Sequence, residues 1–106
     1  MKTVVSTISA KDQFFCIEPI TDNNGRVCGI SEVPIVSWVI QVETDEDGRY
    51  ESSYAFPVTT EPLDTKDRCY VFKYPNGEYR SIMGQPLRDY HEVVAYFNRM
   101  KDAGLL

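Results

Sequence analysis

The chain has 106 residues, of which 42% are hydrophobic and 25% are charged. These values are ordinary for a folded domain, so we expect residues 1–106 to form a single domain. The net charge of −5 disfavours direct binding to nucleic acid, because its phosphates would be repelled. The longest apolar stretch, IVSWVIQV, is too short to cross a bilayer, and the N-terminal residues lack a signal-peptide core. We therefore predict a cytoplasmic protein without membrane contact.

Three turn signals that each end in glycine divide most of the chain: DNNG at residues 22–25, DEDG at 45–48 and YPNG at 74–77. Each lies between runs rich in β-branched and aromatic residues, which is typical of successive antiparallel hairpins. The first hairpin is expected to pair residues 14–20 with 26–30. The N-terminal run KTVVSTIS is expected to form a further strand.

The second hairpin shows the clearest alternation of apolar and polar residues. Its even positions are apolar in IVSWVIQVE and, apart from Ser52, in RYESSYAFPV, which predicts one buried and one exposed face. A three-residue loop at 46–48, with Gly48 in the left-handed region, keeps the even positions on one face. This loop predicts pairing of Ile40 with Tyr54 and of Trp38 with Phe56.

The third hairpin joins RCYVFKY to EYRSIM and leaves two registers open. A tight turn at Asn76 and Gly77 would place Tyr74 opposite Tyr79. Pro75 at the second turn position and Gly77 at the fourth also suit a type I turn followed by a bulge.

The C-terminal segment changes to helical periodicity, with Val93, Phe97 and Met100 on one face. Asp89 is the expected N-cap, and Pro86 is an alternative helix start. A Schellman motif is expected at the helix end, with Gly104 as its left-handed residue. The predicted fold class is therefore α+β: an antiparallel meander of three hairpins, about five to seven strands, with one amphipathic C-terminal helix packed on the sheet.

The excess negative charge is confined to residues 43–64, which hold seven acids and one base, a net charge of −6. We predict that these acids bind a protein partner with a basic surface. They are Glu43, Asp45, Glu46, Asp47, Glu51, Glu61 and Asp64. The hairpin tip does not match a calcium-binding EF-hand loop, because its glycine comes two positions too early and no glutamate stands at the twelfth position.

The cysteines and the single histidine carry no strong signal. Cys16, Cys28, Cys69 and His91 are a possible zinc-ligand set, but close pairs such as C-x₂-C are missing. Cys16 and Cys28 lie on the two arms of the first hairpin and could face each other. No motif of a hydrolase or phosphate-binding enzyme occurs, so we expect no cofactor, no metal and no catalytic residue.

Three function hypotheses follow. The first is a non-catalytic binding protein, in its sharpest form a small acidic inhibitor that occupies a nucleic-acid-binding surface, as phage or mobile-element counter-defence proteins do. This link is at the level of protein class and not of a residue pattern. The second is a structural module that assembles with itself or a partner through its sheet edges. The third, an enzyme that depends on Cys69 and His91, is the least supported.

Overall fold

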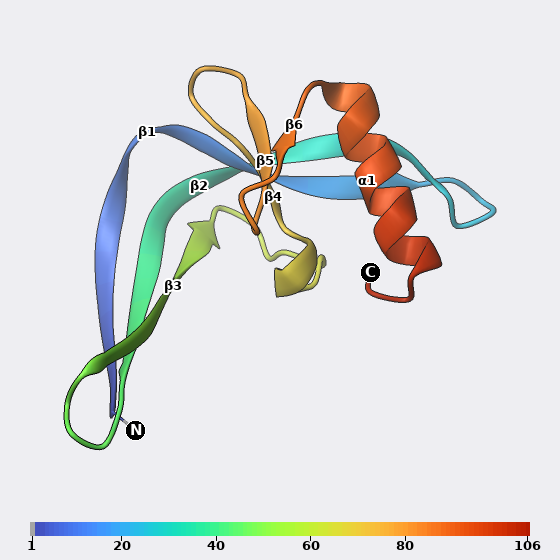
Figure 1. Ribbon diagram of the computed structural model, residues 1–106. Coiled ribbons are helices and arrows are strands. Elements are labelled where there is room, and N and C mark those ends of the chain that lie inside the picture. The colour runs from blue at the N-terminus through green and yellow to red at the C-terminus, as the bar shows by residue number, and fades with distance from the viewer. Residues whose placement is uncertain (1) are drawn as a thin grey trace.

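The computed structural model describes the backbone of residues 2–106 and, in the first strand, the side chains of Thr7, Ile8 and Asp12 onward. In chain order the elements are β1 (Lys2–Thr21), β2 (Val27–Thr44), β3 (Tyr50–Thr59), the 3₁₀ helix η1 (Asp67–Cys69), β4 (Val71–Lys73), β5 (Tyr79–Ser81), β6 (Pro86–Leu87) and α1 (Tyr90–Asp102). Within these residues the strands form one antiparallel sheet in the order β3-β2-β1-β4-β5-β6 (Figure 1). The predicted α+β class is confirmed, with β4 placed beside β1 and not beside β3.

The predicted glycine turns share one construction, a three-residue loop closed by a left-handed glycine. In the first hairpin the Asp22 N–H donates to the Arg26 carbonyl (2.8 Å), and the Gly25 N–H donates to the Asp22 carbonyl (3.0 Å). The Asp22 carboxylate also accepts two N–H groups of the turn. The second hairpin repeats these bonds around Asp45, with Gly48 at φ 80°. Glycine is favoured there because other L-residues are strained at positive φ.

The third hairpin adopts the second of its two predicted registers. The Tyr74 N–H donates to the Glu78 carbonyl, so residues 75–77 form the loop. A fourth hairpin, between β5 and β6, uses the same turn with Ser81 in the first position. Its hydroxyl accepts the Gln85 N–H at 3.1 Å, in place of the aspartate carboxylate. The sequence does not predict this hairpin, because its two strands are too short to show an alternation of apolar and polar residues.

The second hairpin has the predicted loop and a different strand register. Asp45 lies opposite Arg49 as expected, but β3 then holds one extra residue, Glu51, relative to β2. The observed pairs include Glu43 with Ser52, Ile40 with Ala55 and Trp38 with Pro57. The predicted pairing of Ile40 with Tyr54 and of Trp38 with Phe56 is therefore wrong. A one-residue bulge shifts the pairs that follow it relative to the predicted register. A second irregularity, between Ile35 and Ser37, restores that register at the pair Ile35–Thr59.

The long strands β1 and β2 bend sharply and divide the molecule into an arm and a body (Figure 1). The arm comprises residues 2–9 and 36–59, and the remainder is the body. At the bend, β1 holds extra residues between Ser9 and Phe14, whose partners on β2 are only two positions apart. The β2–β3 ladder ends nearby at Pro34, whose carbonyl accepts the Thr60 N–H. Proline has no N–H to extend the ladder on that side. The molecule is elongated, with extents of 50 × 31 × 24 Å.

Helix α1 begins at the predicted N-cap. The Asp89 carboxylate accepts the Glu92 N–H at 3.0 Å, and the Glu92 carboxylate accepts the Arg88 N–H. The alternative start at Pro86 is wrong, because Pro86 belongs to β6.

The helix ends in the predicted Schellman motif. The Leu105 N–H donates to the Met100 carbonyl at 2.9 Å, and the Gly104 N–H donates to the Lys101 carbonyl at 3.0 Å. Gly104 has φ 73°, the left-handed conformation that this motif requires.

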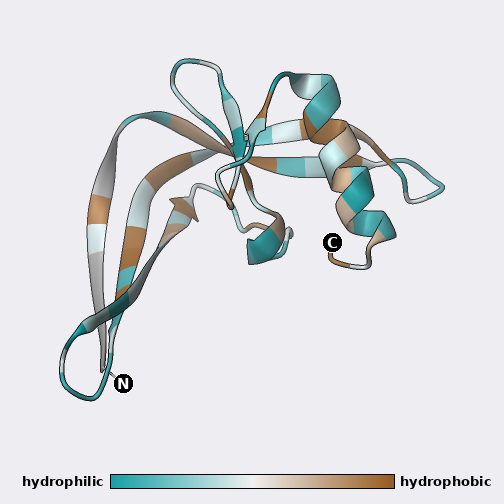
Figure 2. Cartoon of the chain, in the orientation of Figure 1, coloured by the Kyte–Doolittle hydropathy of each residue, from teal (hydrophilic) through white to brown (hydrophobic). Residues whose placement is uncertain are grey.

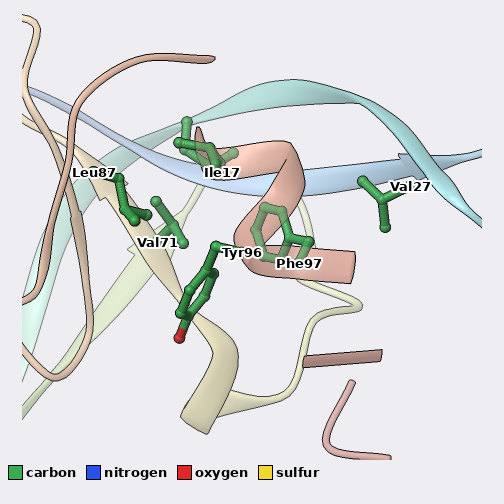
Figure 3. Packing of buried hydrophobic residues seen from close by; sticks show 7 residues of the cluster. Ile17, Val27, Val71, Leu87, Tyr96 and Phe97 are labelled. Atoms are coloured by element: carbon green, nitrogen blue, oxygen red, sulfur yellow. The ribbon is translucent and has the colours of Figure 1, made fainter. Parts of the chain in front are cut away.

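The main core lies between α1 and the body half of the sheet (Figure 3). Its buried members are Ile17, Val27, Val71, Leu87, Val93, Tyr96 and Phe97. A side-chain amide adds a polar link: Asn98 accepts the Val27 N–H at 2.9 Å and donates to the Val27 carbonyl at 3.0 Å. Asn98 thus pairs with the backbone of β2 where that strand has no β3 neighbour.

A second buried cluster contains Cys16, Ile35, Tyr70 and Phe72, with Trp38 packed against it. The sequence predicts a helix packed on the sheet, but the helix does not cover the predicted apolar face of the second hairpin. Tyr50 and Tyr54 are 69% and 48% exposed. The reason is the bend, which carries β3 and its partner away from α1. Figure 2 shows that the helix, with its alternating hydrophobic and hydrophilic bands, lies over the body strands.

Candidate partner-binding surface

The acidic tip lies at the far end of the arm (Figure 1). We define the acidic tip as Glu43, Asp45, Glu46, Asp47 and Glu51. The Asp45 carboxylate is committed to the turn, since it accepts the N–H groups of Asp47 and Arg49 at 3.0 and 2.9 Å. The side chains of Glu46, Asp47 and Glu51 are exposed. The turn that Asp45 holds in shape therefore presents carboxylates to solvent, and Figure 2 shows the loop as hydrophilic.

The other two predicted acids lie elsewhere. Glu61 and Asp64 follow the C-terminal end of β3, which is roughly 30 Å from its start at about 3.3 Å per residue. Asp64 is beside Glu18, whose carboxylate accepts the N–H groups of Asp64 and Thr65 at 3.3 and 3.4 Å. Lys66 lines the same shallow depression. The structure thus separates the predicted binding residues into five at the tip and two at the base of β3.

The acidic tip carries unbalanced charge. The described ion pairs join Arg26 to Asp102, Lys73 to Glu32 and Arg80 to Glu78, all in the body. No described cationic side chain forms an ion pair with a carboxylate of the tip. Unpaired carboxylates at the end of a projecting arm create a negative field that attracts a basic surface.

The outer edge of β3 is not predicted from the sequence. Among the described residues β3 is the terminal strand of the sheet, with β2 as its single neighbour. Residues 52–60, SSYAFPVTT, contain no charged side chain. Soluble proteins usually protect long edge strands with charges, bulges or covering segments. An uncharged run next to a charged turn was the available sequence signal, but it did not show that β3 is an edge.

An aromatic hollow opens between the middle of β3 and the body. It has a volume of about 400 Å³. Its lining residues are Trp38, Ser53, Tyr54, Ala55, Phe56, Phe72, Tyr74 and Ile82. The Trp38 ring lies edge-on to Phe72 at 5.4 Å. The hollow is therefore mostly apolar, and it lies between the acidic tip at one end of β3 and Glu61 at the other.

The cysteines and His91 are not brought together as a metal site. Cys16 lies opposite Val33 and not opposite Cys28, so the suggestion that the two cysteines face each other is wrong. The Cys28 thiol donates to the Ile20 carbonyl at 3.5 Å. The Cys69 thiol donates to the Leu105 carbonyl at 3.3 Å, at the end of the helix. Among the described residues, no three His, Cys, Asp or Glu side chains are grouped closely enough to hold a metal ion.

The three thiols should differ sharply in reactivity. Burial raises the pKa of Cys16 from 9.0 to about 12 and also raises the pKa of Cys69, whereas Cys28 is exposed. For Cys16 this change lowers the thiolate fraction at pH 8 roughly a thousandfold. We expect a thiol reagent at pH 8 to modify Cys28 of the native protein quickly, and Cys16 and Cys69 only on unfolding. Mass spectrometry of the labelled peptides measures this, and equal rates at all three would contradict the buried positions.

The same burial has a consequence for stability against pH. The unfolded Cys16 thiol ionises near pH 9.0, but the folded thiol keeps its proton to about pH 12. The folded state therefore binds more protons over that range, and Cys16 destabilises the fold progressively only as the pH rises above about 9.

Comparisons with protein-family models, with curated proteins and with solved structures found no match for this chain. Within the described residues, α1 is a helix of 13 residues, and no helix there is long and apolar enough to span a membrane. The function must therefore be inferred from the surface itself.

Proposed function

We propose that the protein is a non-catalytic binding module that docks its acidic tip on a basic surface of a protein partner. The observation that carries the proposal is the placement of five carboxylates at the end of an arm that projects from the body, without described cationic partners. Charge placed in this way adds little to the stability of the fold. It is well suited to steering and orienting a partner.

We further propose which molecule the partner's basic surface normally binds. Surfaces rich in lysine and arginine most often bind nucleic acid, through its phosphates. The carboxylates of the acidic tip would take the place of those phosphates, and the protein would act as a competitive inhibitor. We propose counter-defence proteins of phages and mobile elements as the biological setting, a link at the level of protein class only.

A catalytic role is less well supported. Nucleophilic cysteines need a lowered pKa, and burial raises the pKa of both Cys16 and Cys69. His91 is exposed, with its ring against Tyr90 at 5.2 Å and not beside a thiol. We propose the cytoplasm as the compartment, because three free cysteines suit a reducing environment.

The acidic tip offers a matched test, because the first hairpin contains the same turn without the extra charge. Glu46→Asn with Asp47→Asn converts the turn sequence DEDG to DNNG, which residues 22–25 already form. The backbone should therefore be unchanged while two charges are removed. We expect binding to the partner to weaken about twofold to thirtyfold, since exposed charge pairs contribute roughly 0.2–1 kcal/mol each.

The measurement is an affinity capture from nuclease-treated lysate, followed by titration of the captured protein with each variant at low and high salt. The control variant, Asp12→Asn with Asp67→Asn, removes the same amount of charge from exposed positions of the body. Weaker binding for the tip variant, together with displacement of nucleic acid from the partner by the wild type, supports the proposal. A captured partner whose affinity ignores both the tip variant and salt would show that the acidic tip is not the docking surface.

A further inference from the structure

The outer edge of β3 is built to accept another strand. β3 spans Tyr50–Thr59, and its pairing with β2 occupies only one side. An unpaired edge presents backbone N–H and C=O groups that an extended segment can bind. Pro57 lacks one donor, but it leaves the rest of the edge available. None of the usual charged protection is present between residues 52 and 60.

The surroundings of this edge are suited to an added strand with apolar side chains at its centre. The aromatic hollow lies against residues 53–56 and is lined by Trp38 of the arm and by Phe72, Tyr74 and Ile82 of the body. Tyr54 is 48% exposed, and its ring lies 6.4 Å from that of Phe56. Large apolar side chains that are left exposed beside a hollow are typical of binding grooves.

The charge at the two ends of β3 indicates which kind of segment binds its outer edge. Both ends of β3 are acidic, with Glu43 and Glu51 at its start and Glu61 just beyond its end. A second copy of this chain, paired antiparallel through β3, would bring the acidic tip of each copy beside the acidic base of the other. Pairing centred on Phe56 would place Glu51 directly opposite Glu61. A self-paired dimer is therefore disfavoured by repulsion.

We propose that β3 binds an extended segment of a protein partner by strand addition, and that this segment is basic at both ends and uncharged and apolar in its middle. Its backbone pairs with the outer edge of β3, its central side chains enter the aromatic hollow, and its terminal lysines or arginines meet the acidic tip and Glu61. The proposal rests on the function proposed above and adds the form of the partner. It also gives a role to Glu61, which lies too far from the acidic tip to act together with it.

Synthetic peptides test strand addition separately from attraction by charge. The probe has about eleven residues, enough to span β3 at roughly 3.3 Å each, with Lys-Arg at both ends and alternating Val and Thr between them. A second peptide has the same sequence with every backbone nitrogen of the Val and Thr residues methylated, which keeps the charge and removes the N–H donors from both edges of that segment. Fluorescence anisotropy with the full-length protein should show at least about tenfold weaker binding of the methylated peptide, because several backbone hydrogen bonds are lost.

Two protein variants provide the matching control. Ala55→Lys adds a cation at the centre of the β3 edge, and Met83→Lys adds the same charge at a site that is 87% exposed in the β5–β6 turn. We expect Ala55→Lys to weaken peptide binding about tenfold and Met83→Lys to leave it within about twofold. The methylated peptide keeps the test decisive on the wild-type protein if the Ala55 variant folds poorly.

The outcomes separate this proposal from the proposed function. Equal binding of both peptides overturns strand addition, while sensitivity to Glu46→Asn with Asp47→Asn would still support docking of the acidic tip. No binding of the first peptide also overturns strand addition. So does a dimer in sedimentation equilibrium that excess peptide fails to dissociate, which would assign the edge to a second copy. Loss on methylation with no effect of the tip variant would support strand addition and count against the acidic tip.

Discussion

Replacing Phe97 by alanine is expected to lower the free energy of unfolding by about 3–5 kcal/mol, the usual cost of removing a fully buried aromatic ring. Phe97 is 0% exposed and lies in the core between α1 and the body strands, where Figure 3 shows it beside Tyr96. Domains of this size are stable by about 5–15 kcal/mol in total, so the variant should be close to unfolding at room temperature. Urea denaturation followed by circular dichroism measures the change.

The control for this experiment is Met83→Ala. Met83 is 87% exposed, so its truncation should change stability by less than about 0.5 kcal/mol. A loss below about 1 kcal/mol for Phe97→Ala would mean that α1 does not pack on the sheet as described. The effect is expected to be global, because Phe97 lies in the main core between α1 and the body strands.

The features that the sequence predicts well are those decided by a few neighbouring residues. Asp89 and Gly104 set the two ends of α1 through their own capping bonds. Gly48 sets the loop of the second hairpin because it occupies a left-handed position. Each of these residues acts through local backbone geometry, which hardly depends on the rest of the fold.

The features that the sequence did not predict depend on distant parts of the chain. The bulge at Glu51 is not predicted from the sequence, yet it changes the pairs from Glu43–Ser52 to Ser37–Val58. The bend between Ser9 and Phe14 decides that Tyr54 is exposed, because it moves the arm away from α1. The alternation of apolar and polar residues predicts which face of a strand is apolar, but it does not predict whether another element covers that face.

The candidate site shows the same division. The acidic tip and the unusual charge of residues 43–64 could be predicted from composition alone. The separation of Glu61 from the tip follows from the ten-residue length of β3, which is also the length of the expected strand RYESSYAFPV. The status of β3 as an edge strand depends on β4 pairing with β1, a contact between residues more than 50 positions apart in the case of Cys16 and Phe72.

Replacing Phe72 by alanine is expected to cost a similar 3–5 kcal/mol and to loosen the arm as well. Phe72 is 8% exposed and belongs to the second cluster, on β4. Its ring lies edge-on to Trp38 at 5.4 Å and to Tyr70 at 6.1 Å. Trp38 belongs to β2 within the arm, so the Phe72–Trp38 contact joins the arm to the body.

The single tryptophan makes this joint directly observable. Under native conditions Phe72→Ala should shift the emission of Trp38 to longer wavelength, because its ring loses an apolar neighbour and gains water. Phe97→Ala should not do so until the protein unfolds, since Phe97 belongs to the other cluster. The two variants therefore separate a local change at the joint from a global loss of stability. An unchanged native emission spectrum in a folded Phe72→Ala variant would contradict the described contact, and with it the aromatic hollow that Trp38 and Phe72 help to line.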